Sequence, residues 1–351
     1  MNLGVIIRDW YKKNKRDLPI RQTRDPYRIW IAEVIMQQTR LNQGLPYYHR
    51  FIEAFPNVHV LASASEREVL NLWQGLGYYS RARNLQEAAR DIEERFGGHM
   101  PLDYEGLLSL KGVGKYTAAA IASFCYAEPV AAVDGNVSRV IARLFGVEEA
   151  INSSPGARQI EKLARELLDP EDPGTHNQAM IDLGAMICVP VSPRCSECPL
   201  SGHCEAFGSG WVDRLPVKIP KKKPVDRWIW FYIIINKGEL ILTRRGTDEI
   251  WKSLYQFPAE ESDTPLSETG MMDRAAALFL PALPPALSLK KISPEIKHQL
   301  THLTLHARFI HLELERWPDT LPEPWIKISP DHIDDFPVPR LINRYMESFN
   351  F

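Results

Sequence analysis

Four cysteines within seventeen residues are the feature that most constrains how this chain can fold. They are Cys188, Cys195, Cys198 and Cys204, with the spacing C-x6-C-x2-C-x5-C. In a chain without signs of secretion, so many thiols in one stretch predict a metal centre rather than disulfides. Tetrahedral sulfur ligation suits Zn²⁺ or an iron–sulfur cluster. Because only the middle two cysteines are spaced like half of a zinc site, a structural [4Fe–4S] cluster is favoured over zinc or free thiols.

Length and composition bound the class of protein. With 351 residues, 44% hydrophobic and 25% charged, the chain has the composition of a soluble globular protein of about two domains. The longest uninterrupted apolar stretch, residues 228–235, is too short to cross a bilayer. The N-terminus has no apolar segment followed by a small-residue cleavage site. We therefore expect a cytoplasmic protein with no membrane contact.

Basic residues are unevenly distributed along the chain. The formal net charge is −2, yet residues 1–50 contain ten Lys and Arg against four Asp and Glu, and residues 211–227 contain six against two. A nearly neutral protein can bind a phosphate backbone through one basic face. Nucleic acid is therefore a candidate partner, and ordinary solvated surface charge is the alternative.

Two domains and a linker are expected. Up to residue 207 the chain is mostly helical in pattern, because apolar residues recur at helical spacing and Gly or Pro separates the segments. The periodic segments are Val58–Leu76, Leu85–Phe96, Thr117–Phe124, Val137–Leu144 and Ile160–Leu168. Residues 208–227, with Gly, Pro and a Lys run, are the predicted linker.

Residues 228–351 have the pattern of an α+β domain. Runs of β-branched and aromatic residues predict two strands joined around Asn236-Lys237-Gly238. Residues 302–317 predict either a further strand pair or one long strand, and Met271–Leu280 predicts a helix.

Two glycines mark a helix–turn–helix segment at residues 107–122. In LLSLKGVGKYTAAAIA, Gly112 and Gly114 interrupt two apolar helical patterns. Glycine lets backbone N–H groups approach an anion closely, and the start of the second helix adds partial positive charge. Such a turn can hold DNA phosphate without reading sequence, although a packing turn between helices explains the same pattern.

Glu33 stands in unusual surroundings. It is the only acidic residue between Asp25 and Glu53, and apolar residues flank it in YRIWIAEVIMQQTR. Apolar surroundings raise the pKa of a carboxyl group, so Glu33 is a candidate general acid. The alternative is a polar stripe of Glu33, Gln37 and Arg40 on an ordinary amphipathic helix.

Asp134 precedes the helical pattern in DGNVSRVIARLF. Asp-Gly-Asn is a good helix start, so capping alone is one explanation of Asp134. The other is a carboxylate that the helix N-terminus keeps ionised and able to stabilise a cation. One neutral acid and one charged carboxylate suit cleavage of an N-glycosidic bond through an oxocarbenium-like state.

Together these motifs resemble a known family. The hairpin, the Asp twenty residues after Gly114 and the four-cysteine loop resemble the helix-hairpin-helix DNA glycosylases of the endonuclease III superfamily. Within it, WIAEVIMQQTR, GLGYYSRARNL, DGNVSRV and the extra C-terminal domain resemble adenine glycosylases of the MutY type. The resemblance implies a mainly α glycosylase core with an iron–sulfur loop at 188–204, followed by an α+β Nudix-like domain. It implies base-excision repair of duplex DNA with adenine opposite 8-oxoguanine or guanine.

The resemblance also implies a role for each matching residue. Glu33 matches the general acid that protonates adenine at N7, Asp134 the carboxylate that stabilises the oxocarbenium ion, and Tyr116 and Asn136 residues that assist there. The residues implied to bind DNA are Arg21 beside the flipped adenine, Gln38 and Tyr78 in the base stack, the backbone of Lys111, Val113 and Lys115 at phosphate, and Thr301 and His302 at the oxidised base. A monovalent cation is sometimes held at such a hairpin.

Two features separate enzyme classes. Glycosylases that also cut the strand use a lysine nucleophile directly after the hairpin, where this chain has Tyr116, so a monofunctional glycosylase is predicted. The adjacent Lys115 would point about 100° away on a helix. Residues after 228 lack the R-E-x-x-E-E run of Nudix hydrolases, which predicts binding rather than pyrophosphate hydrolysis.

Some positions depart from the family pattern. Ile20 stands where Trp is usual beside adenine, and Leu300 stands where Phe is usual in the loop at the oxidised base. A histidine-rich strand face is the alternative explanation of His298, His302 and His306.

Two other function classes stay open. They are a bifunctional pyrimidine glycosylase/lyase, which Tyr116 disfavours, and a catalytically silent DNA-damage binder, which Glu33 and Asp134 disfavour. A monomer is the default expectation, with nucleoid association when DNA is bound. Contacts with a sliding clamp or with mismatch-repair proteins are conceivable.

Overall fold

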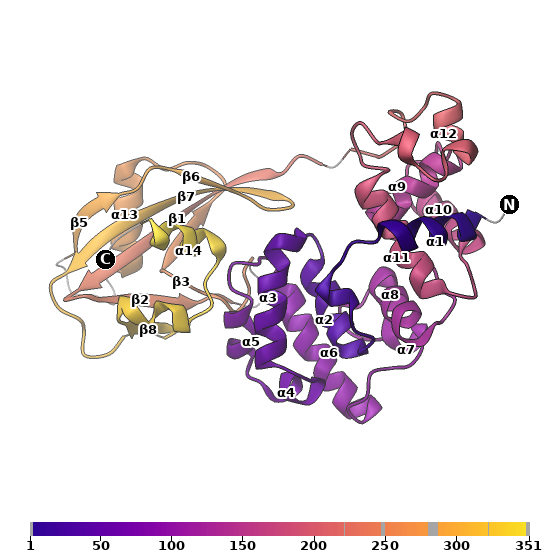
Figure 1. Ribbon diagram of the computed structural model, residues 1–351. Coiled ribbons are helices and arrows are strands. Elements are labelled where there is room, and N and C mark those ends of the chain that lie inside the picture. The colour runs from indigo at the N-terminus through magenta and orange to yellow at the C-terminus, as the bar shows by residue number, and fades with distance from the viewer. Residues whose placement is uncertain (1–2, 221, 247–249, 280–286, 322, 349–351) are drawn as a thin grey trace. The chain divides into compact units, whose positions relative to one another are not determined.

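The computed structural model describes residues 3–220, 222–246, 250–279, 287–321 and 323–348, and it divides into two compact units (Figure 1). The first unit comprises Met1–Ala64 and Ser80–Pro220, and the second comprises Ser65–Tyr79 and Lys221–Phe351. The short Ser65–Tyr79 segment therefore belongs to the same unit as the C-terminal part of the chain. Within the described residues, every helix is too short or too polar to cross a membrane.

The first unit is built from helices. They are α1 (Leu3–Asn14), α2 (Pro26–Met36), α3 (Leu41–Ala54), α4 (Val58–Ser63), α6 (Ser80–Phe96), α7 (Tyr104–Leu108), α8 (Lys115–Tyr126), α9 (Gly135–Leu144), α10 (Ser154–Leu167), α11 (Pro173–Met186) and the short α12 (Glu205–Gly208). Asp, Asn or Ser side chains cap many of them by accepting hydrogen bonds from first-turn N–H groups. Helix α5 (Glu66–Leu72) lies in the second unit and begins with a capping box of Ser65 and Glu68.

Helix α2 differs from the amphipathic helix that the sequence allowed. Seven of its eleven residues are buried, and it ends at Met36. Gln38 then takes a left-handed backbone, with φ of 55°. The alternative explanation, a helical stripe of Glu33, Gln37 and Arg40, is therefore wrong, because Gln37 and Arg40 lie beyond the helix. Glu33 is instead a lone carboxylate on an apolar helix.

The glycine turn joins α7 to α8, as predicted. Gly112 has φ of +74°, and a Cβ there would lie 2.6 Å from the Asn84 side chain, so both backbone conformation and space require glycine. A Cβ on Gly114 would meet nothing within 4 Å, so packing does not require glycine at this second position.

The second unit contains one mixed sheet. Its strands are β1 (Val225–Asn236), β2 (Glu239–Arg244), β3 (Tyr255–Gln256), β4 (Ala259–Ser262), β5 (Leu287–Ile292), β6 (Ile296–Gln299), β7 (Leu303–Leu314) and β8 (Trp325–Ile328). The main order is β3-β2-β1-β7-β5, and β1 pairs with β7 in parallel. The predicted strand pair around residues 236–238 is confirmed as β1 and β2, and residues 303–314 form one long strand.

Both faces of this sheet are buried. Ile229, Phe231 and Ile233 of β1 share a core with α14 (Arg340–Glu347), whereas the alternate residues pack with α13 (Glu268–Phe279). A strand buried on both sides has no polar alternation, which explains the continuous apolar run of β1. The helix predicted at 271–280 is confirmed as α13, and Leu280 lies outside the described residues.

Candidate active site

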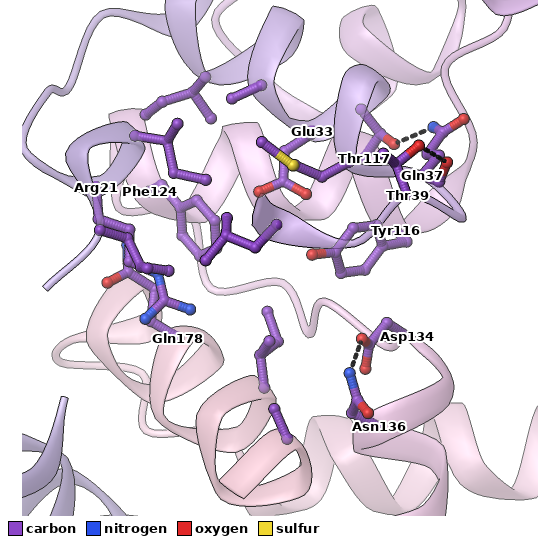
Figure 2. A pocket seen from close by; sticks show the side chains of 18 of the residues that line it. Arg21, Glu33, Gln37, Thr39, Tyr116, Thr117, Phe124, Asp134, Asn136 and Gln178 are labelled. Carbon is purple, nitrogen blue, oxygen red and sulfur yellow. Dashed lines mark hydrogen bonds between the residues drawn. The ribbon is translucent and has the colours of Figure 1, made fainter. Parts of the chain in front are cut away.

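One cavity in the first unit gathers most of the residues predicted to contact adenine. Its volume is about 710 Å³, within the range of small-molecule sites. Figure 2 shows Glu33 and Tyr116 facing a common space, with Asp134 and Asn136 on another part of the wall. The predicted site residues that line it are Arg21, Glu33, Gln38, Gly112, Gly114, Tyr116, Asp134 and Asn136. Ile20 also lines it.

Glu33 is partly exposed to this cavity while its helix neighbours are buried. Burial raises the pKa of its carboxyl group to about 7. A hydrogen bond with Tyr116 and the charge of Arg21 oppose this shift, whereas the nearby Asp134 adds to it. Glu33 can therefore both hold and release a proton near neutral pH.

Asp134 caps α9. Its Oδ1 accepts from the Val137 backbone N–H at 2.7 Å, and its Oδ2 accepts from the Asn136 side-chain amide at 2.8 Å. Burial raises the pKa of Asp134, while these hydrogen bonds lower it. The net direction is upward, because the desolvation of this buried carboxyl group outweighs its hydrogen bonds.

Arg139 connects Asp134 to the cysteine loop through Asn136. Its guanidinium donates to Asn136 Oδ1 at 3.1 Å and to the Cys188 carbonyl at 2.7 Å. It also donates to the Gly184 carbonyl at 2.7 Å. The start of α9 and the start of the cysteine loop are therefore held by one side chain.

The four loop cysteines fit a thiolate-bound cluster. All four are free thiols and partly buried. Burial, together with the charges of the other three thiols, raises the pKa of Cys198 to about 11. Arg143 lies within 3.4 Å of the Cys188 sulfur and donates to the Val189 carbonyl at 2.8 Å. A bound cluster would cross-link residues 188–204 and hold this loop on the helical core.

Two further cavity residues, Gln178 and Gln37, were not predicted, nor was Asp182, which binds the cavity residues Arg16 and Arg21. Asp182 on α11 is fully buried and accepts two hydrogen bonds from Arg21, at 2.7 and 2.9 Å, and two from Arg16, at 2.5 and 2.8 Å. Gln178 accepts from the Tyr11 hydroxyl at 2.7 Å, and Gln37 donates to Thr117 at 3.3 Å. Asp182 had a detectable signal: it is a lone carboxylate in the apolar run AMIDLGAM, as Glu33 is in its own helix.

The lysines of the hairpin lie away from this cavity. Lys115 Nζ lies 3.0 Å from both carboxylate oxygens of Glu161 and lines a separate cavity. Lys111 is 3.7 Å from Glu87. Val113 is buried, which leaves only its backbone for a ligand.

Tyr78, Thr301 and His302 belong to the second unit. The hydroxyls of Tyr78 and Thr301 lie 3.4 Å apart, and His302 is exposed. His306 instead has a structural role, because its ring nitrogens bond Glu295 at 2.8 Å and Asp226 at 2.9 Å.

Family models match three consecutive parts of the chain. Residues 31–170 match an HhH-GPD superfamily base excision DNA repair protein, residues 188–204 the iron-sulfur binding domain of endonuclease III, and residues 229–348 a NUDIX domain. The adenine DNA glycosylase of Buchnera aphidicola subsp. Baizongia pistaciae is 34% identical over 318 residues, which are 88% of this chain and 86% of that protein. The chain belongs to the adenine DNA glycosylase family.

A second relative supports the same membership. The adenine DNA glycosylase of Homo sapiens is 45% identical to this glycosylase over 206 residues, 56% of this chain and 38% of that protein. The structure of a thermostable thymine-DNA glycosylase is similar with a TM-score of 0.55 and 30% identity, covering 59% of this chain and 95% of that chain. An endonuclease III–DNA complex is similar with a TM-score of 0.51 and 25% identity, covering 59% and 94%.

These similarities confirm the predicted family, fold class and iron–sulfur loop. The protein is an adenine DNA glycosylase of base-excision repair, DNA is its substrate, and Cys188, Cys195, Cys198 and Cys204 are the cluster ligands. Zinc and free thiols are thereby set aside. The roles of the cavity residues stay predictions.

Proposed function

We propose that the glycosylase hydrolyses the N-glycosidic bond of adenine opposite 8-oxoguanine or guanine in duplex DNA and leaves the strand uncut. The supporting observation is the composition of the cavity. Glu33, Tyr116 and Asp134 line it, and within the described residues no lysine does. We place catalysis in residues 1–207 and recognition of the opposite base in residues 228–351, joined by the linker 208–227.

Glu33 acts as the acid in this proposal. With a pKa of about 7, a large share of Glu33 is protonated at neutral pH. The proton passes from its carboxyl group to N7 of the flipped adenine, and the glycosidic electron pair leaves with the base. Protonation turns adenine into a neutral leaving group, which is why an acid of this pKa accelerates the step.

Asp134 stabilises the resulting cation at C1′. Both of its oxygens already accept hydrogen bonds, so the carboxylate is fixed before the substrate arrives. A water molecule then adds to C1′ and gives its proton to a carboxylate, which completes hydrolysis. Burial and the adjacent Glu33 and Asp134 charges raise the pKa of Tyr116 well above its usual range, so its hydroxyl stays a hydrogen-bond donor throughout.

Strand cleavage requires an amine at C1′. The adjacent Lys115 pairs with Glu161 and lines a different cavity from Glu33. For Lys115 to form a Schiff base at C1′, this ion pair would have to break and the lysine side chain would have to reorient towards the cavity that Glu33 lines. Hydrolysis without a covalent lysine intermediate is therefore the proposed outcome.

Recognition of the opposite base is assigned to the second unit and to Gln38. Tyr78 is 51% exposed, and its hydroxyl lies near that of Thr301, so both side chains are accessible to the bases of a bound duplex. Gln38 is exposed on a left-handed turn at the cavity. Such side chains can fill the stack that a flipped adenine vacates.

Single-turnover cleavage tests the proposed function. Duplexes with adenine opposite 8-oxoguanine, guanine or thymine are incubated with the full-length protein, and each reaction is split between alkali and borohydride. We expect alkali-dependent breaks at the mispaired adenine and no trapped protein–DNA complex. A borohydride-trapped complex would overturn the monofunctional assignment. Equal cleavage opposite thymine would overturn the mispair assignment.

A further inference from the structure

The loop between α5 and α6 has an unusual backbone conformation. Gly75 and Gly77 have φ of 87° and 80°, and Tyr78 has φ of 49°. Left-handed backbone is costly for a tyrosine, and the surrounding structure has to impose it. Within the loop, the Trp73 indole N–H donates to the Gly77 carbonyl at 3.0 Å. The Gly75 N–H donates to the Tyr79 hydroxyl at 3.4 Å. Further restraints come from a distant part of the chain.

The segment Asp335–Asn343, in the same compact unit, supplies those restraints. Arg340 donates a hydrogen bond from its guanidinium to the Gly75 carbonyl. The Tyr79 hydroxyl donates to the buried Val338 carbonyl at 2.9 Å. The Gln74 amide donates to Asn343 Oδ1 at 3.1 Å. Residues on both sides of Tyr78 are therefore bound to one short segment.

Helix α5 is attached to the same segment. Arg67 and Asn71 each donate to the Asp335 carbonyl at 2.9 Å. The Arg67 guanidinium also lies over the Phe336 ring, 4.4 Å from its centroid. The contacts thus extend from the helix through the whole loop.

Asp335–Asn343 is itself fixed to the sheet. The Pro337 carbonyl accepts from the Tyr255 N–H of β3 at 2.8 Å. Leu341 and Ile342 of α14 are buried in the core on one face of the sheet. A segment held this way can hold the loop in one place. The Thr301 hydroxyl at the β6–β7 turn lies 3.4 Å from the Tyr78 hydroxyl.

We propose that Asp335–Asn343 fixes the conformation of the Gly75–Tyr78 loop. Arg340 is then a positioning residue that affects whether the enzyme prefers 8-oxoguanine or guanine opposite adenine. Arg340 acts through the loop backbone, because it binds the Gly75 carbonyl and holds Tyr78 against Thr301. This inference rests on the proposed function, in which Tyr78 and Thr301 face the opposite base. Its new element is that a residue of the last helix sets this contact.

The test compares four variants of the full-length protein. Arg340→Ala removes the guanidinium, and Arg340→Lys keeps a hydrogen-bond donor. Arg344→Ala is the matched control on the same exposed side of α14. Tyr78→Ala tests whether the Tyr78 side chain itself sets the base preference. The readouts are the ratio of single-turnover rates on A:8-oxoguanine and A:guanine duplexes, and amide exchange of residues 75–79 without DNA. Exchange of residues 80–96 serves as the internal reference.

We expect Arg340→Ala to lower the rate ratio about threefold to tenfold, the range of one hydrogen bond, and to speed exchange in the loop. Arg340→Lys should recover most of the ratio, and Arg344→Ala should keep it. An unchanged ratio in Arg340→Ala while Tyr78→Ala loses it would overturn the positioning role. Unchanged amide exchange of the loop in Arg340→Ala would contradict the claim that Arg340 helps to fix its conformation. If Tyr78→Ala also keeps the ratio, Tyr78 does not read the opposite base, and the inference about base preference fails with it. Amide exchange of the loop still tests whether Asp335–Asn343 fixes its conformation.

Discussion

Two carboxylates of this glycosylase line one cavity, yet the chain holds them in opposite ways. Glu33 projects from the middle of the apolar helix α2, and Asp134 caps the start of α9. Burial raises the pKa of both, to about 7 for Glu33. Asp134 accepts from a backbone N–H on one oxygen and from a side-chain amide on the other. The capping donors of Asp134 favour its charged form and oppose the effect of burial, whereas burial dominates at Glu33.

The comparison predicts that the two groups fail differently when replaced. Glu33→Gln should have the largest effect on excision, because glutamine keeps the size and polarity of the side chain but cannot donate an acidic proton. We expect single-turnover adenine excision to fall about 10²- to 10⁴-fold, the usual contribution of a general acid. Mismatch binding, measured by gel shift, should stay within about twofold, since the DNA contacts are unchanged. Excision at the wild-type rate would show that Glu33 is not the acid.

The same substitution should alter stability in a pH-dependent way. The folded pKa of Glu33 lies above its ordinary value of 4.5, so the folded state binds this proton more tightly than the unfolded state does. The wild type therefore loses stability relative to Glu33→Gln as pH rises from about 4.5 to about 7. Melting temperatures at pH 5 and pH 8 check this sign. The melting temperature of the wild type minus that of Glu33→Gln should be smaller at pH 8 than at pH 5, and a larger difference at pH 8 would contradict the assignment.

Two substitutions of Asp134 should distinguish the effect of its negative charge on catalysis from the effect of its helix cap on stability. Asp134→Asn keeps a good N-cap, whereas Asp134→Ala removes it at a cost of about 1 kcal/mol in unfolding free energy. Both variants lose the negative charge, and we expect excision to fall about 10²- to 10³-fold in each. Denaturant unfolding and single-turnover assays distinguish the two effects. Normal excision by Asp134→Asn, with lower stability only in Asp134→Ala, would make Asp134 a cap alone.

Tyr116→Phe should give the smallest change. The variant removes the hydrogen bond that lowers the pKa of Glu33. We expect that pKa to rise, so the alkaline loss of activity should move to higher pH, with a rate change of about tenfold or less. The pH profile of excision measures the shift. A move to lower pH would mean that Tyr116 does not stabilise the Glu33 carboxylate.

Much of the fold was predictable because local signals agree with it. Helical periodicity located α6, α8, α9 and α10 closely, and the Asn236-Lys237-Gly238 turn located β1 and β2. The short strands β3, β4 and β8 were missed, because two to four residues give no usable alternation. The parallel pairing of β1 with β7 depends on residues about 80 positions apart, which no local pattern specifies.

The cavity was predictable in part, and motif matching supplied most of it. Glu33 and Asp134 had local chemical signals, but Arg21 and Asn136 came only from the resemblance. Asp182 was missed, because its partners Arg16 and Arg21 lie more than 160 residues away in the sequence. For the same reason, the attachment of the 75–78 loop to Asp335–Asn343 becomes visible only once the chain is folded.

The pH dependence of single-turnover excision tests the central claim most directly. The rate on an A:8-oxoguanine duplex is measured from pH 5 to pH 9 at saturating enzyme, with Glu33→Gln as the control. The account predicts a rate that falls about tenfold per pH unit above about 7, and a control without this limb. A wild-type rate that stays constant from pH 6 to pH 9, or the same limb in Glu33→Gln, would contradict the assignment of Glu33 as the acid.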